Sequence, residues 1–124
     1  MAKVLVIEDQ EVLRESILNI LNTRGFNAIG AEDGRRGLQL ATEWVPDLIL
    51  CDIRMPELDG YEVLSSLRQD PLTATIPFLF LTAETIQTVA SKGKLLGANG
   101  YLLKPFTTAE LLEAISLELR DRSP

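Results

Sequence analysis

Histidine is absent from this 124-residue chain, and cysteine occurs once, at Cys51. The lack of histidine excludes Ser-His-Asp and Cys-His catalysis and removes the commonest metal ligand. A single cysteine cannot form an internal disulfide, so we expect a buried strand residue and a cytoplasmic protein. Any metal must then be held by oxygen, which favours Mg²⁺, Ca²⁺ or Mn²⁺.

Basic residues are also in deficit, because 12 Lys and Arg stand against 18 Asp and Glu, for a net charge of −6. This balance argues against nucleic-acid binding, which needs a basic face, and against docking on anionic lipid. The apolar runs, such as 4–7 and 78–81, are far shorter than a membrane span. The N-terminus shows no cleavage site, so no signal peptide is predicted. We therefore expect neither nucleic acid nor membrane among the partners.

Short apolar runs alternate with longer amphipathic stretches along the chain. The apolar runs predict strands at 3–7, 27–31, 48–51, 77–81 and 101–103. Apolar residues at helical spacing predict helices at 11–24, 34–44, 61–68, 86–96 and 107–120. Asn99-Gly100 has the composition of a hairpin turn, but the stretch before it has helical period, so we expect a loop there. This alternation predicts one α/β domain with a parallel sheet covered on both faces.

Five polar or charged residues stand directly after predicted strands. They are Glu8, Asp9, Asp52, Thr82 and Lys104. The carboxyl ends of parallel strands share one edge of the sheet, and ligands bind there, so we expect the five side chains to converge. Each residue alone could be a helix cap or part of a surface turn, and only their joint placement favours a site.

Such a group has a definite chemistry. Several carboxylates in one crevice repel each other, and a divalent cation relieves that repulsion. A carboxylate can act as a nucleophile toward a phosphoryl group, and a lysine or a hydroxyl can then bind the phosphoryl oxygens. The predicted edge therefore suits metal-assisted phosphoryl transfer.

The same residues carry a family resemblance. Glu8-Asp9, Asp52-Ile53-Arg54-Met55-Pro56 with Asp59-Gly60, Thr82-Ala83 and Lys104-Pro105-Phe106 resemble the response-regulator receiver domains of two-component signalling, of the chemotaxis-regulator kind. The likeness covers essentially the whole chain, 1–124. It implies a doubly wound five-stranded sheet of flavodoxin-like order 2-1-3-4-5, with two helices on one face and three on the other. It also implies a phosphorylation-controlled switch that receives its phosphoryl group from a sensor histidine kinase or a histidine phosphotransfer protein.

The resemblance assigns a role to each residue of the acidic group. Asp52 matches the phosphoacceptor, which becomes an aspartyl phosphate. Glu8, Asp9, Asp52 and the backbone carbonyl of Arg54 match the protein ligands of Mg²⁺, for which Mn²⁺ is a substitute. The first acidic position is more often aspartate in the family, so Glu8, one methylene longer, departs from the pattern and puts the metal geometry in question.

Further positions match the switch itself. The resemblance implies that Thr82 follows the phosphoryl group, that Lys104 pairs with it and that Tyr101 turns inward in response. It implies a cis bond between Lys104 and Pro105. The residues that match loop-shaping positions are Pro56, Gly60 and Pro105. By the same analogy, homodimerisation through the face of the last helix is an open expectation.

Arg54 and Glu84 flank the expected site, each two residues after a site residue. We hypothesise that their opposite charges pair across the mouth of the site and lengthen the life of the phosphoryl group. The alternative is that both are solvated side chains.

Two other functions remain open for this sequence. A degenerate receiver would only bind partners, but all five pocket positions are filled. A phosphatase with an aspartyl nucleophile typically has a second aspartate two residues later, where this chain has Arg54. We therefore expect catalysis only of the chain's own phosphotransfer and dephosphorylation. The tail shows no linker, which slightly favours a stand-alone regulator over a receiver cut from a longer protein.

Overall fold

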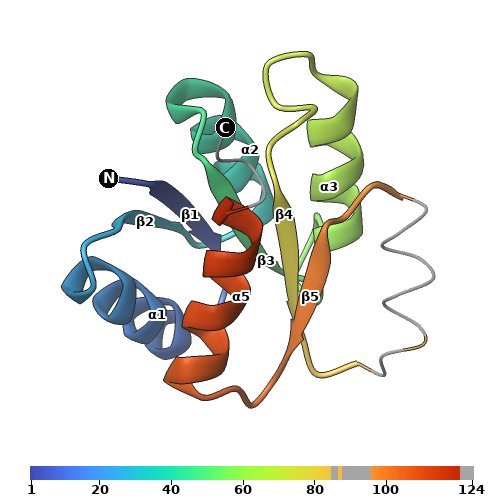
Figure 1. Ribbon diagram of the computed structural model, residues 1–124. Helices are drawn as coiled ribbons and strands as arrows, with labels where there is room; N and C mark the ends of the chain where they lie inside the picture. The colour runs from blue at the N-terminus through green and yellow to red at the C-terminus, as the bar shows by residue number, and fades with distance from the viewer. Residues whose placement is uncertain (85–86, 88–95, 121–124) are drawn as a thin grey trace.

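The computed structural model describes residues 1–84, 87 and 96–120. In these residues five strands form one sheet, ordered β2-β1-β3-β4-β5 (Figure 1), and every neighbouring pair is parallel. The strands are β1 (Lys3–Ile7), β2 (Asn27–Ala31), β3 (Leu48–Asp52), β4 (Phe78–Thr82) and β5 (Gly100–Leu103). The helices are α1 (Glu11–Thr23), α2 (Gly34–Trp44), α3 (Gly60–Gln69) and α5 (Thr108–Arg120). The predicted α/β class and strand order are confirmed.

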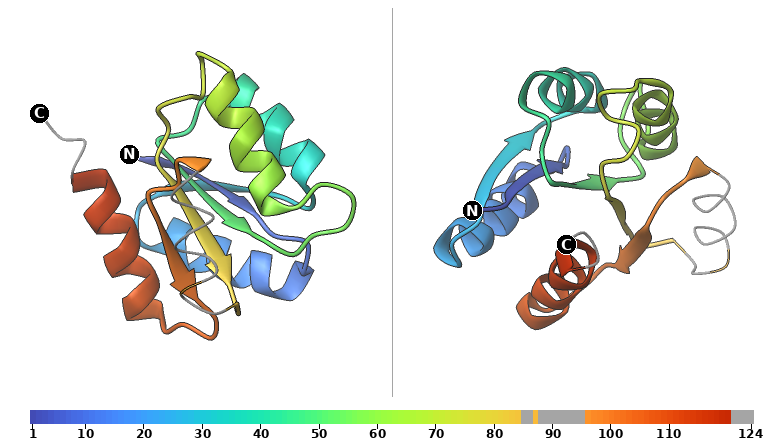
Figure 2. Two further views of the ribbon diagram at one scale, coloured as in Figure 1. Left: turned by 90° about the vertical axis from the view of Figure 1, so that its right-hand side faces the viewer. Right: turned by 45° about the horizontal axis from the view of Figure 1, so that its top comes forward.

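Two apolar layers explain why both faces of the sheet are covered. On one face, Val6 and Leu50 pack with Ile17 of α1 and Leu111 of α5. On the other face, alternate strand residues pack against α2 and α3, and the buried Cys51 lies in this layer as expected. Figure 2 shows the two helix pairs on opposite sides of the sheet. The predicted helix at 86–96, which would add a third helix to one face, falls mostly outside the described residues.

The predicted element bounds are close to those observed, with small corrections. Asp52 was expected to begin a loop, but it pairs with Leu81 as the last residue of β3. β4 begins at Phe78 rather than at Pro77, because Pro77 has no N–H to donate to the ladder. β5 pairs parallel with β4, so the expectation that Asn99-Gly100 is not a hairpin turn is confirmed. Gly100 is nevertheless the first residue of β5 rather than part of the expected loop, because it pairs with Leu79. In the described part of the chain, no helix is both long and apolar enough to cross a membrane.

Polar side chains hydrogen-bond to the backbone at the amino edge of the sheet, where the strands begin. The backbone N–H of Lys3 donates to Asp47 Oδ2 at 2.7 Å, and the Asp47 N–H returns a bond to the Lys3 carbonyl at 2.8 Å. At the start of β4 the Phe78 N–H donates to Asn99 Oδ1 at 2.8 Å, and Arg68 of α3 donates to the same oxygen at 3.2 Å. These bonds complete the backbone ladder where the strands enter the sheet.

Candidate functional site

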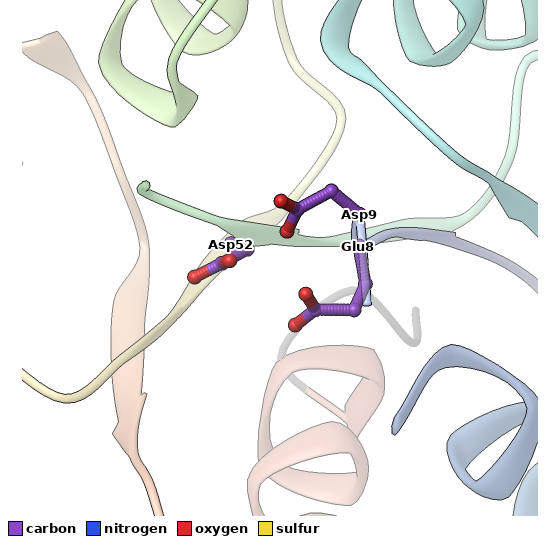
Figure 3. Close-up of side chains that lie close together, drawn as sticks. All are labelled: Glu8, Asp9 and Asp52. Carbon is purple, nitrogen blue, oxygen red and sulfur yellow. The ribbon is translucent and has the colours of Figure 1, made fainter. Parts of the chain in front are cut away.

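Three carboxylates gather at the carboxyl edge of the sheet, where the strands end (Figure 3). Glu8, Asp9 and Asp52 each offer an oxygen that lies within 4.8 Å of the other two. The topology explains their proximity, because Glu8 follows β1 and Asp52 ends the neighbouring strand β3. Glu8 is fully buried, and Asp52 is 7% exposed.

Lys104 directly follows β5, an outermost strand of the sheet, and its side chain reaches this acidic cluster. Its Nζ lies 2.9 Å from Glu8 Oε1 and 3.2 Å from Asp52 Oδ1. The structure therefore brings together four of the five residues expected to converge. The fifth, Thr82, ends β4 and is buried, and its hydroxyl oxygen accepts a hydrogen bond from the Glu84 N–H at 2.9 Å.

Burial shapes the charge state of the cluster. It raises the pKa of Asp52 above its ordinary value, against the opposing charge of Lys104. It also raises the pKa of Glu8, against the hydrogen bond from Lys104. Burial lowers the pKa of Lys104, but the hydrogen bond to Glu8 and the charge of Asp52 outweigh this and leave that pKa raised. The single ammonium group of Lys104 therefore cannot balance the charge of three ionised carboxylates.

The donor set fits a hard divalent cation. All three side chains supply carboxylate oxygens, which are the ligands that such cations prefer. A doubly charged ion at this position would offset the repulsion that one lysine leaves. The cluster could therefore hold a divalent metal ion.

The loop after Asp52 is built around a close backbone approach. A Cβ on Gly60 would lie 2.4 Å from the Asp52 carbonyl oxygen, so this position requires glycine. The Gly60 N–H donates to the Ile53 carbonyl at 2.8 Å. Within the loop the Pro56 carbonyl accepts from the Leu58 N–H at 2.8 Å, which places Glu57 between them at φ +66°. Residue preference does not predict this left-handed residue, because such positions usually carry glycine or asparagine.

Two other expected features lie beside the site. Arg54 Nε is 2.7 Å from Glu84 Oε1, so the expected pairing of these side chains is present. The Lys104–Pro105 peptide bond is cis. Tyr101 lies on β5, half-buried against the layer that faces α2 and α3.

One contact at this edge was not predicted. Arg14 of α1 donates from Nη1 to the Glu8 carbonyl oxygen at 2.9 Å. In the sequence, Arg14 looks like a solvated residue of an amphipathic helix. The one feature of the sequence that could have indicated this contact is position. Arg14 stands six residues after Glu8, in the first turns of the helix that follows.

Comparisons with known proteins agree with this geometry. The family model described as the response regulator receiver domain matches residues 4–116. A probable transcriptional regulator, ycf29 of Pyropia yezoensis, is 40% identical over 92% of this chain and 51% of its own length. The chain spans about half the length of that relative and of several other curated relatives it matches.

Solved structures extend the likeness to the fold. The Vibrio cholerae chemotaxis protein CheY4 superposes with a TM-score of 0.92 and 34% identity, over 96% of this chain and 99% of its own. The receiver domain of the Pseudomonas aeruginosa sensor histidine kinase PA1611, described with a magnesium ion coordinated in its active-site cleft, gives a TM-score of 0.88. It is 30% identical over 96% of this chain and 98% of its own. The chain thus belongs to the response regulator receiver domain family, the phosphorylation-controlled switches of two-component signalling.

Proposed function

We propose that Asp52 is the phosphoacceptor of a receiver domain that occupies the whole chain, 1–124. The observation that carries this proposal is the position of Lys104, whose Nζ bridges Glu8 and Asp52 inside the acidic cluster. A buried carboxylate nucleophile thus has a cation beside it before any phosphoryl group arrives. The donor is a phosphohistidine on a sensor histidine kinase or a histidine phosphotransfer protein.

The reaction is a displacement at phosphorus. An oxygen of Asp52 forms the new P–O bond while the P–N bond to the imidazole breaks, and the ring nitrogen keeps the electron pair. Lys104 balances the charge of the incoming phosphoryl oxygens. Hydrolysis of the acyl phosphate later restores Asp52. The chain catalyses only these two reactions of its own carboxylate.

Magnesium is the metal we assign to the acidic cluster, with Mn²⁺ as a substitute of the same oxygen chemistry. Glu8, Asp9 and Asp52 would hold it together with the backbone carbonyl of Arg54. The ion supplies charge neutralisation for the transferring phosphoryl group. The magnesium described in the Pseudomonas receiver supports this choice.

The signal then passes from the site to β5 and α5. The added charge attracts the Thr82 hydroxyl and Lys104, and Tyr101 on β5 follows inward. Because Lys104 directly follows β5, a shift at the site biases the surface of β5 and α5 between two arrangements. A partner protein in the cytoplasm, or a second copy of the chain docking through α5, would read that surface.

The test is the intact mass of the chain after incubation with a small phosphodonor and Mg²⁺. We expect a gain of one phosphoryl group that Asp52→Asn abolishes. Asp70→Asn is the matched control, because Asp70 lies at the end of α3, where its Oδ1 accepts from the Leu72 N–H, and it should label normally. No gain with a small donor or a cognate kinase would overturn the proposal in favour of a receiver that only binds partners. Repeated release of phosphate from unrelated monoesters would favour a phosphatase.

A further inference from the structure

Glu8 is held through every one of its polar groups. Its N–H donates to the Ala31 carbonyl at 3.0 Å, and its Oε1 accepts from Lys104 Nζ at 2.9 Å. Its Oε2 accepts from the Gln10 N–H at 3.1 Å. Its carbonyl oxygen accepts from Arg14 Nη1 at 2.9 Å. These four bonds hold the acidic turn between β1 and α1, and two of them come from side chains outside the turn, Lys104 after β5 and Arg14 on α1.

Arg14 closes the acidic turn in two ways. Its backbone N–H donates to the Gln10 carbonyl at 2.9 Å, as the helix requires, while its guanidinium reaches back to the Glu8 carbonyl. That carbonyl belongs to the peptide plane that joins Glu8 to Asp9. Fixing this plane fixes the N and Cα atoms of Asp9, from which one of the three carboxylates extends. The guanidinium also makes this a charge-assisted hydrogen bond to the backbone of the acidic pair.

Gly30 on β2 makes room for Arg14. It pairs with Val6 of β1, so it lies on the strand that borders the acidic turn. A Cβ on Gly30 would stand 3.0 Å from Arg14 Cδ and 2.9 Å from Leu18 Cδ1. The absence of a side chain therefore lets the arginine stem lie over β2 on its way to Glu8.

We propose that Arg14, seated over Gly30, is a positioning residue for the metal-binding acidic turn. It acts through Glu8 and Asp9 rather than by touching the metal or the phosphoryl group. This inference rests on the proposed function of the same site. Partners that orient metal ligands from behind typically change metal affinity tenfold or more when they are removed, because the ligands lose their preset orientation.

The test is a Mg²⁺ titration of the full chain, monitored through the amide NMR shifts of Asp9 and Gln10. A urea unfolding curve for each variant measures stability separately. Arg14→Met keeps a stem over Gly30 but removes the guanidinium, and its dissociation constant should rise on the order of tenfold. Arg14→Lys retains a donor and should recover part of the loss. Gly30→Ala displaces the stem and should weaken binding by a few-fold. Arg36→Met is the matched control, since Arg36 lies on α2 and bonds to Gln39.

The outcomes separate the two proposals. A Mg²⁺ dissociation constant for Arg14→Met within twofold of that for Arg36→Met overturns the positioning role. A lower urea midpoint for Arg14→Met with unchanged Mg²⁺ affinity overturns it as well. If the wild-type chain binds Mg²⁺ and the Arg14 variants bind it equally well, only this inference fails. If the wild-type chain takes up no Mg²⁺, the proposed metal site fails and this inference fails with it.

Discussion

The two edges of the sheet contrast in how they treat charge. At the amino edge, Asp47 and Asn99 bond to the strand starts at Lys3 and Phe78, and these bonds stabilise the fold. At the carboxyl edge, two of the three clustered carboxylates share Lys104, and burial raises the pKa of both Glu8 and Asp52. The amino edge therefore stabilises the fold, while the carboxyl edge keeps mutually repelling carboxylates close together, as a cation-binding site requires. Such a division is common where a site must hold charge that its ligand will later balance.

The sharpest way to break this contrast is to remove one lysine from each edge. Lys104→Ala should slow phosphoryl uptake on the order of a hundredfold, because a preset charge for the phosphoryl group is lost. Lys3→Ala removes the bond of Lys3 Nζ to the Trp44 carbonyl, 2.7 Å long, at the amino edge. That variant should take up the phosphoryl group at the normal rate. Time courses of intact mass measure both, and equal slowing would show that the edges are not functionally separate.

Asn99 tests the stabilising edge. Asn99→Ala leaves the buried Phe78 N–H without its acceptor and takes a partner from Arg68. The unfolding free energy should fall by about 2 kcal/mol, as measured by urea denaturation. Phosphoryl uptake at a temperature where the variant is folded should not change. A large loss of uptake without a loss of stability would contradict the assignment of this edge.

Asp52→Asn tests the carboxyl edge through the pH dependence of the unfolding free energy, measured in the presence of a metal chelator. The folded pKa of Asp52 is raised, so the folded state binds its proton more tightly than the unfolded state does. The stability linked to this group is present below the ordinary pKa and is lost as the pH rises through the folded pKa. Asp52→Asn should therefore be more stable than wild type at pH 7, by less than the change at Asn99. The gap should close on acidification, and a gap independent of pH would show that the buried charge of Asp52 is not its cause.

The smallest effect should come from the mouth of the site. The Arg54 side chain is 81% exposed, so its pair with Glu84 is a weak contact of the surface kind. We expect Glu84→Ala to shorten the lifetime of the phosphoryl group about threefold, within the range that such a pair can supply. Glu57→Ala breaks an exposed pair with Arg35 instead and should leave the lifetime unchanged. Equal lifetimes for wild type and Glu84→Ala would sink the screening hypothesis.

The sequence predicted the sheet because parallel strands buried on both faces are continuous apolar runs. The run Leu48–Cys51 shows this, and it also shows the limit, since Asp52 extends the strand without being apolar. The sequence also predicted which side chains would share an edge, because that follows from topology alone. Asp52 and Lys104 are placed by the ends of their strands.

Other features have no local signal. The bond from Arg14 to Glu8 depends on the angle at which α1 leaves the sheet. The contact of Arg68 with Asn99 spans 31 positions and needs the finished fold. Glu57 adopts a left-handed conformation that its side chain does not favour. These details are set by tertiary packing, which periodicity and residue preference do not encode.

The bond between Lys104 and Glu8 joins residues 96 positions apart, which directly follow β5 and β1, two strands that do not neighbour each other. β3 and β4 must both be in place before this lysine can reach across the edge. A nascent or truncated chain that lacks β5 would still carry Asp52, but without its cation. Until β5 has docked, the three carboxylates therefore lack the ammonium group that lies against two of them in the finished fold.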